Sequence, residues 1–435
     1  MSAYQDAADP WWDFSRLRNG TLWDDPTASE LPLIPRNTAH NRLVKQVKTL
    51  SDLLDAKQVL RKHLRRKLLI LSLLIAYLED RGVFPADYFG RFLKGATKFF
   101  EVLANGRSLV KLLDTLEERF NGQVFALNDT DRATLRDSHQ LKHFASLVEG
   151  CQEDNGQLTL WQLYSFKDLP VELISHIYQL FVDDQDSSVY TPPFLVRLML
   201  DEALSWQRLD RLQERNEVIL DPACGSGVFL VEAYKRLVLH WRSRNAWQRP
   251  QESTLKALLH KVHGIDVEDG AIELAAFSLC LALCDALEPE AIRASIKLFP
   301  PLAGKTLHRA CFFDAKDENF FSPPIGVVVG NPPFKSKLST PGAVRSAKRY
   351  QAKHGPLPDK QLAYLFLNDA MEMVAPGGVL SMLQQYNLLY NQQSRGFRRD
   401  FFADWDVREV LDFVSVRGLF KKGGADTKVV VVVAE

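Results

Sequence analysis

Two short segments of the chain carry side chains whose types and spacing could do chemistry. Residues 221–227 read Asp-Pro-Ala-Cys-Gly-Ser-Gly, and residues 331–334 read Asn-Pro-Pro-Phe. Each segment directly follows an apolar run, and the first leads into a helical pattern, which predicts a strand, a turn and a helix start. Ligands of open α/β sheets bind outside the carboxyl ends of the strands. We therefore expect the two segments to lie on one rim of a sheet.

The first segment is typical of a turn that surrounds part of a nucleoside cofactor. Gly225 and Gly227 let the backbone approach a ligand and free the first amides of the following helix to meet an anionic group. Asp266 ends the next predicted strand, where a carboxylate can accept both hydroxyls of a ribose. Asp314 follows a third apolar run and is expected to read an adenine amino group. The alternatives are a solvated acid at a helix start for Asp266 and a plain surface charge for Asp314.

The second segment is suited to holding an amine. An exocyclic amine on an aromatic ring is a poor nucleophile because its lone pair is delocalised into the ring. The Asn331 side-chain oxygen and the Pro332 carbonyl could accept its two hydrogens, and Pro332 and Pro333 fix the backbone so that these acceptors converge. Phe334 then offers a face on which a planar base could stack. The alternative is a strand-ending turn with a buried phenylalanine.

Bulk properties restrict the classes of protein to which the chain could belong. The 435 residues contain 54 basic and 54 acidic side chains, so any surface for a nucleic acid must be local. Five cysteines in mostly apolar surroundings suit reduced thiols in the cytoplasm. Cys280 and Cys284 lie one helical turn apart without further ligands nearby, which favours packing over a metal site. The longest uncharged apolar run, residues 68–78, is too short to span a membrane.

The pattern of the chain changes near residue 186. We expect an irregular arm at residues 1–38, an all-α domain at 39–185 and a domain of alternating strands and helices at 186–435. Seven short apolar runs in the last domain predict a doubly wound, mostly parallel seven-stranded sheet. They lie at residues 217–220, 260–265, 307–312, 325–330, 378–383, 407–413 and 427–433.

Together these motifs resemble the gamma group of S-adenosylmethionine-dependent N6-adenine DNA methyltransferases. The resemblance implies the Rossmann-like class I methyltransferase fold and S-adenosylmethionine as the cofactor. It also implies that Thr191, in a Tyr-Thr-Pro-Pro stretch at residues 190–193, contacts the methionine carboxylate of the cofactor. The cofactor-binding residues that it implies are Tyr190, Thr191, Asp221, Pro222, Ala223, Gly225, Gly227, Asp266 and Asp314, and the catalytic residues are Asn331, Pro332, Pro333 and Phe334.

The helical region extends this resemblance. Residues 78–82, 120–125 and 169–181 are similar to the N-terminal helices of type I modification subunits and of large single-chain restriction-modification or phage-defence methylases. Gly326 departs from the family, which often carries an acidic residue at this strand position. Family members generally carry a target-recognition domain after the last strand or borrow one from a specificity subunit. No such domain is seen in this sequence, so we expect a partner chain or a longer protein.

DNA contact is then expected from local features. Basic side chains follow the Asn-Pro-Pro-Phe motif in what the sequence suggests is a flexible loop that clamps phosphates, namely Lys335, Lys337, Arg345, Lys348 and Arg349. The alternative is a solvated loop whose positive sign is accidental. Phe420 resembles the aromatic residue that sandwiches a flipped base against Phe334, with Phe413 as the second choice.

The resemblance implies an enzyme that moves a methyl group from S-adenosylmethionine to N6 of an adenine flipped out of double-stranded DNA. Such an enzyme would work in the cytoplasm in restriction-modification or phage defence, without a metal or a membrane. One alternative is a protein glutamine N5-methyltransferase, because an amide nitrogen suits the same motif. Another is a cofactor-binding DNA scaffold in a defence complex, which would bind without turnover.

Overall fold

The structure is a computed structural model of the chain. It describes residues 54, 60–120, 125–149, 191–321, 323–334, 336–416, 420–422 and 425–435. The expected arm at residues 1–38 lies outside the described residues, as do two expected site residues, Tyr190 and Lys335. In the described part of the chain, no helix is both long and apolar enough to cross a membrane.

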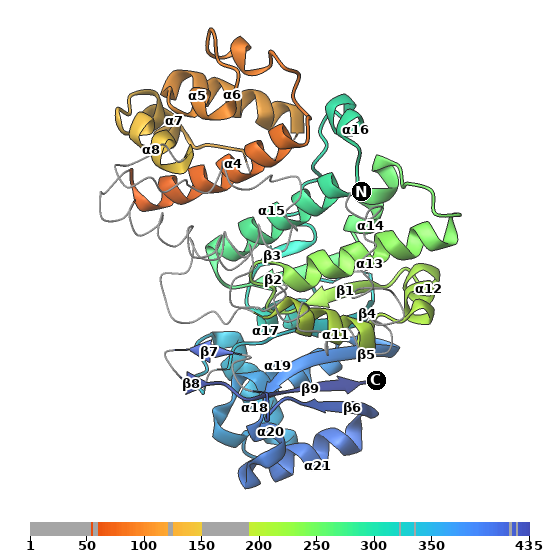
Figure 1. Cartoon of the computed structure of the whole chain (residues 1–435). Coiled ribbons are helices and arrows are strands. Elements are labelled where there is room, and N and C mark those ends of the chain that lie inside the picture. Colours follow the sequence, from red (N-terminus) through yellow and green to blue (C-terminus); the bar gives the residue numbers. More distant parts are fainter. Residues whose placement is uncertain are drawn as a thin grey trace, which may run out of the picture.

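A seven-stranded sheet forms the centre of the fold (Figure 1). β1 lies between β2 and β4 and pairs with both in parallel, while β9 lies between β5 and β6 and is antiparallel to both. The arrangement confirms the predicted mostly parallel sheet. In order across the sheet, the strands are β3 (Leu307–Arg309), β2 (Val262–Asp266), β1 (Val218–Asp221), β4 (Ile325–Gly330), β5 (Val374–Gln385), β9 (Val429–Ala434) and β6 (Val407–Asp412). A separate two-stranded ribbon pairs β7 (Lys421–Lys422) with β8 (Ala425–Asp426).

Helices cover both faces of the sheet, so β1, β4 and β9 are buried along their whole length. Side chains alternate along each strand: Ile219 joins one hydrophobic cluster, whereas its neighbours Val218 and Leu220 join the other. The first cluster is shared with α11 (Pro193–Ala203), α12 (Trp206–Glu214), α13 (Val228–Arg244), α14 (Glu252–Leu259) and α15 (Asp269–Asp285). The second is shared with α17 (Phe312–Asp317), α18 (Pro341–His354), α19 (Leu362–Met371), α20 (Asn387–Tyr390) and α21 (Arg395–Asp404).

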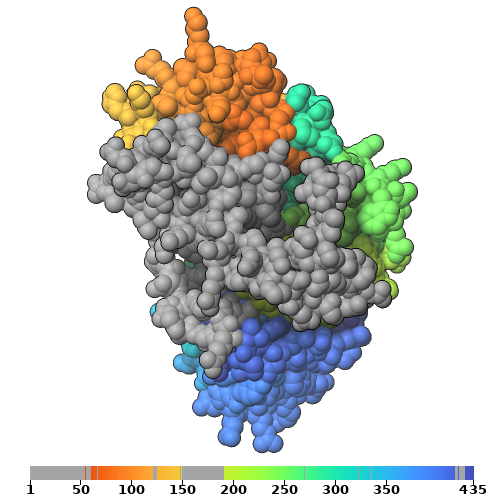
Figure 2. Space-filling view, viewed as in Figure 1, coloured from red at the N-terminus to blue at the C-terminus, as the bar shows by residue number. Residues whose placement is uncertain are grey.

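A group of helices from the first third of the chain packs at one end of this sheet, beside α15 and α16 (Figure 1). Figure 2 shows the surface of this group, in orange and yellow, at the same end of the molecule. Its buried side chains belong to the same hydrophobic cluster as those of α13 and α15. Arg81 donates hydrogen bonds to the carbonyls of Cys284 (3.0 Å) and Leu287 (2.8 Å), which ties α4 to the end of α15. The group consists of α4 (Lys62–Asp80), α5 (Phe99–Leu103), α6 (Gly106–Phe120), α7 (Asp129–Arg136) and α8 (Gln140–Glu149), while α16 (Pro289–Ala294) comes from the later part of the chain.

The expectation of a flexible basic loop after the Asn-Pro-Pro-Phe motif was wrong for most of its length. Residues 341–354 form α18, whose first turn is capped by the Thr340 hydroxyl accepting from the Ala343 amide at 3.2 Å. Threonine at the cap and Pro341 in the first turn are a recognised helix start. The short turns of helix elsewhere are η5 (Phe89–Arg91), η7 (Pro358–Lys360) and η8 (Gln392–Ser394).

Candidate active site

A cavity of about 220 Å³ opens at the carboxyl ends of β1, β2 and β4. The structure therefore brings together the two motifs that the sequence placed on one rim. Most of the expected site residues line this cavity, namely Thr191, Asp221, Pro222, Ala223, Gly225, Asp266, Asn331, Pro332, Pro333 and Phe334. Gly227, Asp314 and Phe420 are not among its lining residues.

The glycine-rich turn is held in place by the tip of β2. The Gly225 amide donates to a carboxylate oxygen of Asp266 at 2.9 Å, and the Cys224 amide donates to the Ile265 carbonyl at 2.9 Å. Gly227 has a φ of 79° at the start of α13, and a Cβ there would come within 3.0 Å of Ala275 on α15. Gly227 thus shapes the turn through its packing against α15 and not by lining the cavity. Only glycine fits both this backbone and this close contact.

The buried carboxyl group of Asp221, at the end of β1, lies against the end of β4 and so links the two motifs. Asp221 is buried and accepts a hydrogen bond from the Ala223 amide at 3.1 Å. A Cβ at Gly330 would lie 2.7 Å from the same carboxyl oxygen, so the tips of β1 and β4 touch through this group. Burial raises the pKa of Asp221 to about 8. Asp221 is therefore mostly uncharged at neutral pH and adds little negative charge to the cavity.

Asp266 is one of the acidic residues that line the cavity, together with Asp221 and Glu268. Burial raises the pKa of Asp266, while hydrogen bonds from the amides of Glu268 and Gly225 oppose that rise. The Asp266 carboxylate accepts from these amides at the tip of β2, in the place where the sequence predicted a ribose acceptor.

Asn331 offers a buried acceptor at the other wall of the cavity. Its side-chain Nδ2 donates to the Thr191 hydroxyl at 3.0 Å. Its Oδ1 is buried and has no hydrogen-bond partner among the residues that the structure describes. A buried carbonyl oxygen without a partner costs folding free energy, and such groups deserve a functional explanation. This oxygen is suited to accept an N–H from a ligand.

The aromatic residues of the predicted base sandwich lie in different environments. Phe334 is half-buried and forms part of the cavity wall. Phe420 is only 2% exposed and belongs to the hydrophobic cluster against which Phe334 also packs. Phe413 is partly buried against that cluster as well. The described structure therefore does not place Phe334 and Phe420 on opposite sides of the cavity.

Asp314 does not line the cavity, whereas Cys311, which follows β3, does. The carboxylate of Asp314 is paired with Arg345, and a Cβ at Gly342 would lie 2.5 Å from it. Cys311, Phe312 and Phe313 line the cavity instead. The Cys311 thiol lies 3.0 Å from the Thr340 hydroxyl. The sequence did not single out Cys311, because the apolar run at 307–312 predicts a strand that continues to residue 312.

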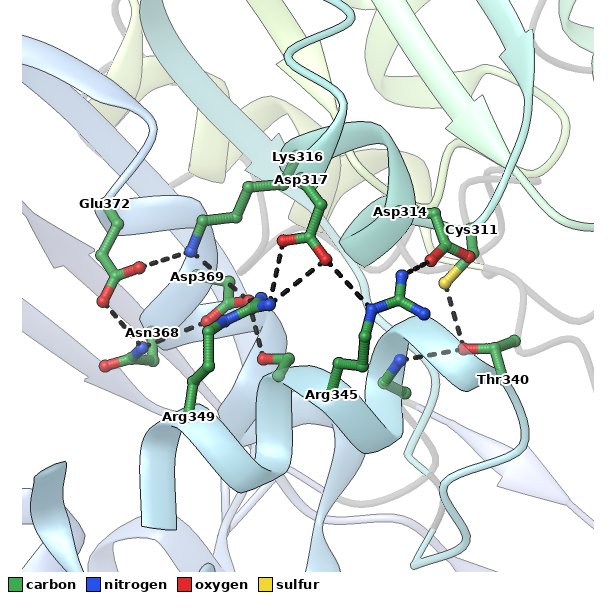
Figure 3. Close-up of polar contacts among 12 residues, drawn as sticks. Cys311, Asp314, Lys316, Asp317, Thr340, Arg345, Arg349, Asn368, Asp369 and Glu372 are labelled. Carbon is green, nitrogen blue, oxygen red and sulfur yellow. Dashed lines mark hydrogen bonds and ion pairs between the residues drawn. The ribbon is translucent and has the colours of Figure 1, made fainter. Parts of the chain in front are cut away.

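A network of ion pairs occupies the arginines that were expected to clamp DNA (Figure 3). Arg345 and Arg349 both extend from α18 to Asp317 of α17, with N–O distances of 3.4 and 3.0 Å. Arg349 also lies 3.7 Å from Asp369 of α19. The network therefore joins three helices on one face of the sheet.

The lysines of the same segment are arranged differently. Lys337 and Lys348 are exposed, and neither makes an ion pair within the described ranges of the chain. Among the described residues that were expected to contact phosphates, Lys337 and Lys348 are therefore the two whose positive charge is available to a ligand.

Gly326, where the family resemblance predicts an acidic residue, faces an acidic group from another element. A Cβ at Gly326 would collide with the buried carboxylate of Glu217, which precedes β1. Arg211 of α12 donates to Glu217 at 3.1 Å. The carboxylate of Glu217 thus fills the space beside Gly326. Gly326 lies near the start of β4, so this departure from the family pattern is at the opposite end of the strand from the cavity rim.

Curated relatives of this chain are named as methylases or methyltransferases. A type I restriction enzyme methylase subunit, MjaVII of Methanocaldococcus jannaschii, is 28% identical over 37% of this chain and 29% of its own length. The type II methyltransferase M.BstVI of Geobacillus stearothermophilus is 26% identical over 52% of this chain and 38% of its own length. The chain thus spans less than two fifths of either relative.

Solved structures share the fold at low sequence identity. The type IIL restriction-modification enzyme MmeI, in complex with DNA, gives a TM-score of 0.61 at 14% identity over 90% of this chain and 57% of that one. A type I methyltransferase subunit from Streptococcus thermophilus gives 0.51 at 13% identity over 92% of this chain and 85% of that one. The family model described as N-6 DNA Methylase matches residues 172–434, which is more than half of the chain. The chain therefore belongs to the N-6 DNA methylase family.

Proposed function

We propose that this protein transfers a methyl group from S-adenosylmethionine to N6 of an adenine in DNA, as part of a restriction-modification or phage-defence system. The observation that carries the proposal is the buried, unpartnered Oδ1 of Asn331 in the wall of a cavity that also contains a glycine-rich turn. Membership of the N-6 DNA methylase family and relatives named as methylases support it.

The residues of the cavity fit the proposed cofactor. The turn at residues 221–227 would hold its methionine end, Asp266 would accept its ribose hydroxyls, and Cys311 and Phe312 would border its adenine ring. The cofactor supplies an electrophilic methyl group when it is bound. Asp221 would support the cofactor site indirectly, by keeping the ends of β1 and β4 in contact.

The chain's own part in the reaction is to hold the target amine. Asn331 Oδ1 and the Pro332 carbonyl would accept the two N6 hydrogens, which draws the nitrogen lone pair out of conjugation with the ring. Phe334 would stack on the base and offset part of the few kcal/mol needed to unstack it from the duplex. Orientation of the amine toward the methyl group then supplies most of the rate. The methylated nitrogen is acidic, so water can take its extra proton.

The proposed partners are double-stranded DNA and a specificity subunit or recognition domain. The short coverage of the curated relatives supports a further recognition module, because most of each relative lies outside the matched part. Exposed Lys337 and Lys348 lie in the segment that follows the Asn-Pro-Pro-Phe motif and would contact phosphates. Phe420 would stack on the base only after a rearrangement that exposes its ring.

The test compares wild type with Asn331→Ala. Wild type, assayed with tritiated S-adenosylmethionine and duplex DNA in the presence of host lysate, should place label in N6-methyladenine. Asn331→Ala should lose at least about a hundredfold in rate, because it removes an acceptor used in the transition state, while its Kd for the cofactor stays close to wild type.

Asn245→Ala is the matched control, because Asn245 is exposed at the end of α13 and does not line the cavity. This variant should keep wild-type activity. Label in protein glutamine instead of DNA would favour the glutamine methyltransferase. Cofactor binding without label in any product would favour the scaffold, and either result would overturn the proposed function.

A further inference from the structure

The contact between Thr191 and Asn331 joins two segments that lie far apart in the sequence. Thr191 directly precedes the two prolines that begin α11, and it is 5% exposed. Its hydroxyl accepts the hydrogen bond from Asn331 Nδ2 at 3.0 Å. Both side chains line the cavity. The contact is therefore a buried polar link inside the proposed active site.

An asparagine amide has two chemically different ends, and its orientation decides what it offers to a ligand. With Nδ2 engaged by Thr191, the end that remains is Oδ1, which is buried and has no partner within the described residues. An aromatic amine presents N–H donors, so an acceptor must face it. If the amide turned over, it would present its own N–H groups to those of the amine, and the amine would not be held.

We infer that Thr191 is a positioning residue for amine methylation: its hydroxyl holds the Asn331 amide in the orientation that presents Oδ1 to the target nitrogen. The inference rests on the proposed function and deepens it. It differs from the role that the family resemblance implies for Thr191, which is contact with the methionine carboxylate of the cofactor. The two roles predict different kinetics, because one acts on the amine and the other on cofactor affinity.

The test uses Thr191→Val and Thr191→Ser. Valine has nearly the shape of threonine without the hydroxyl, and serine keeps the hydroxyl. At saturating cofactor, Thr191→Val should lower kcat on DNA by about tenfold to a hundredfold, the cost of leaving a buried amide N–H unpaired and its orientation free. Thr191→Ser should stay within about threefold of wild type, because serine keeps the hydroxyl that accepts the hydrogen bond. Calorimetric titration with S-adenosylmethionine should give all three proteins Kd values within about twofold, which also shows that each variant is folded.

Thr306→Val is the matched control, since Thr306 is buried, its hydroxyl has no partner within the described part of the chain, and it does not line the cavity. Its kcat should equal that of wild type. A Thr191→Val variant with normal kcat and weakened cofactor binding would overturn the inference and leave the proposed function standing. A wild-type protein that binds the cofactor and methylates no DNA would overturn the proposed function, and the inference with it.

Discussion

Asp221 has a carboxyl group that is stable in the folded protein mainly when it is protonated. Burial raises its pKa from an ordinary value near 4 to about 8. A raised pKa means that the folded state binds the proton more tightly than the unfolded state. The stabilisation is complete below the unfolded pKa and is lost as the pH rises through about 8. Stability should therefore fall between mildly acidic and mildly basic pH.

Asp221→Asn should weaken this dependence on pH. The amide keeps an acceptor for the Ala223 N–H but carries no titrating proton. Urea unfolding at several pH values between about 5 and 8, the range set by the two pKa values, should give a smaller loss of unfolding free energy for the variant than for wild type. Parallel curves for the two proteins would contradict the buried, proton-binding role of Asp221.

The residues of the cavity could be predicted to different degrees. Asp266 is the last residue of β2 and Asn331 directly follows β4, and the change from apolar to polar residues at both strand ends made their place on the rim predictable. Cys311 was not, because Phe312 and Phe313 fit a strand and a helix equally well. The strand ends at Arg309, and the aromatic pair begins α17. Because the strand ends three residues earlier than predicted, Asp314 falls in α17 and does not line the cavity.

α18 illustrates how a helix redirects charges that appear free in the sequence. Arg345 and Arg349 are spaced by four residues, so in a helix they share one face. That face meets Asp317 on α17, and Arg349 also reaches Asp369 on α19 (Figure 3). A loop would have left both arginines available to phosphates. The element, rather than the composition of the segment, decides which positive charges remain available to a ligand.

Lysine and arginine variants of this segment should therefore behave differently. Lys337→Ala and Lys348→Ala should each weaken DNA binding and reduce the slope of log K against log salt by about one, as expected for a lost phosphate contact. Arg349→Ala should leave the slope unchanged and lower the unfolding free energy by roughly 1 kcal/mol or less, because its ion pairs are half-exposed. Fluorescence anisotropy across a salt series measures the slope. A slope that changes in Arg349→Ala would assign that arginine to DNA instead.

At the scale of the whole molecule, the helical group and the sheet share one hydrophobic cluster. Further contacts cross between them: the Phe299 amide donates to the Phe120 carbonyl at 2.8 Å, and the two rings stack at 5.5 Å. Because buried apolar surface is continuous across the junction, the two parts should unfold together. Arg81 is the side chain that satisfies the carbonyls at the end of α15.

Arg81→Ala should weaken this coupling. The substitution removes the donor to the Leu287 carbonyl and one of the donors to the Cys284 carbonyl, which still accepts from the Leu287 amide, so the cost is about 1–3 kcal/mol for the one unsatisfied group. Differential scanning calorimetry should show a lower Tm and a broader or split transition, while cofactor affinity is unchanged. Arg91→Ala is the control, because Arg91 is exposed and, among the described residues, its side chain contacts the Tyr88 ring of its own helical group rather than α15. Equal transitions in the two variants would contradict the coupling.

The architecture was more predictable than the arrangement of its last strands. Seven short apolar runs separated by longer helical patterns predict a layered α/β sheet, because runs of this length suit buried strands better than complete helices. The run of valines in β9 says nothing about direction, and its insertion antiparallel between β5 and β6 depends on pairings made only in the folded protein.

The position of β1 between β2 and β4 has a consequence for synthesis of the protein on the ribosome. β1 carries the glycine-rich turn, but its second edge stays unpaired until β4 emerges, about a hundred residues later. At a typical elongation rate this delay lasts roughly 5–20 seconds. During that time an apolar strand edge is exposed in the nascent chain, which makes it a natural binding segment for a chaperone and the point where aggregation would begin.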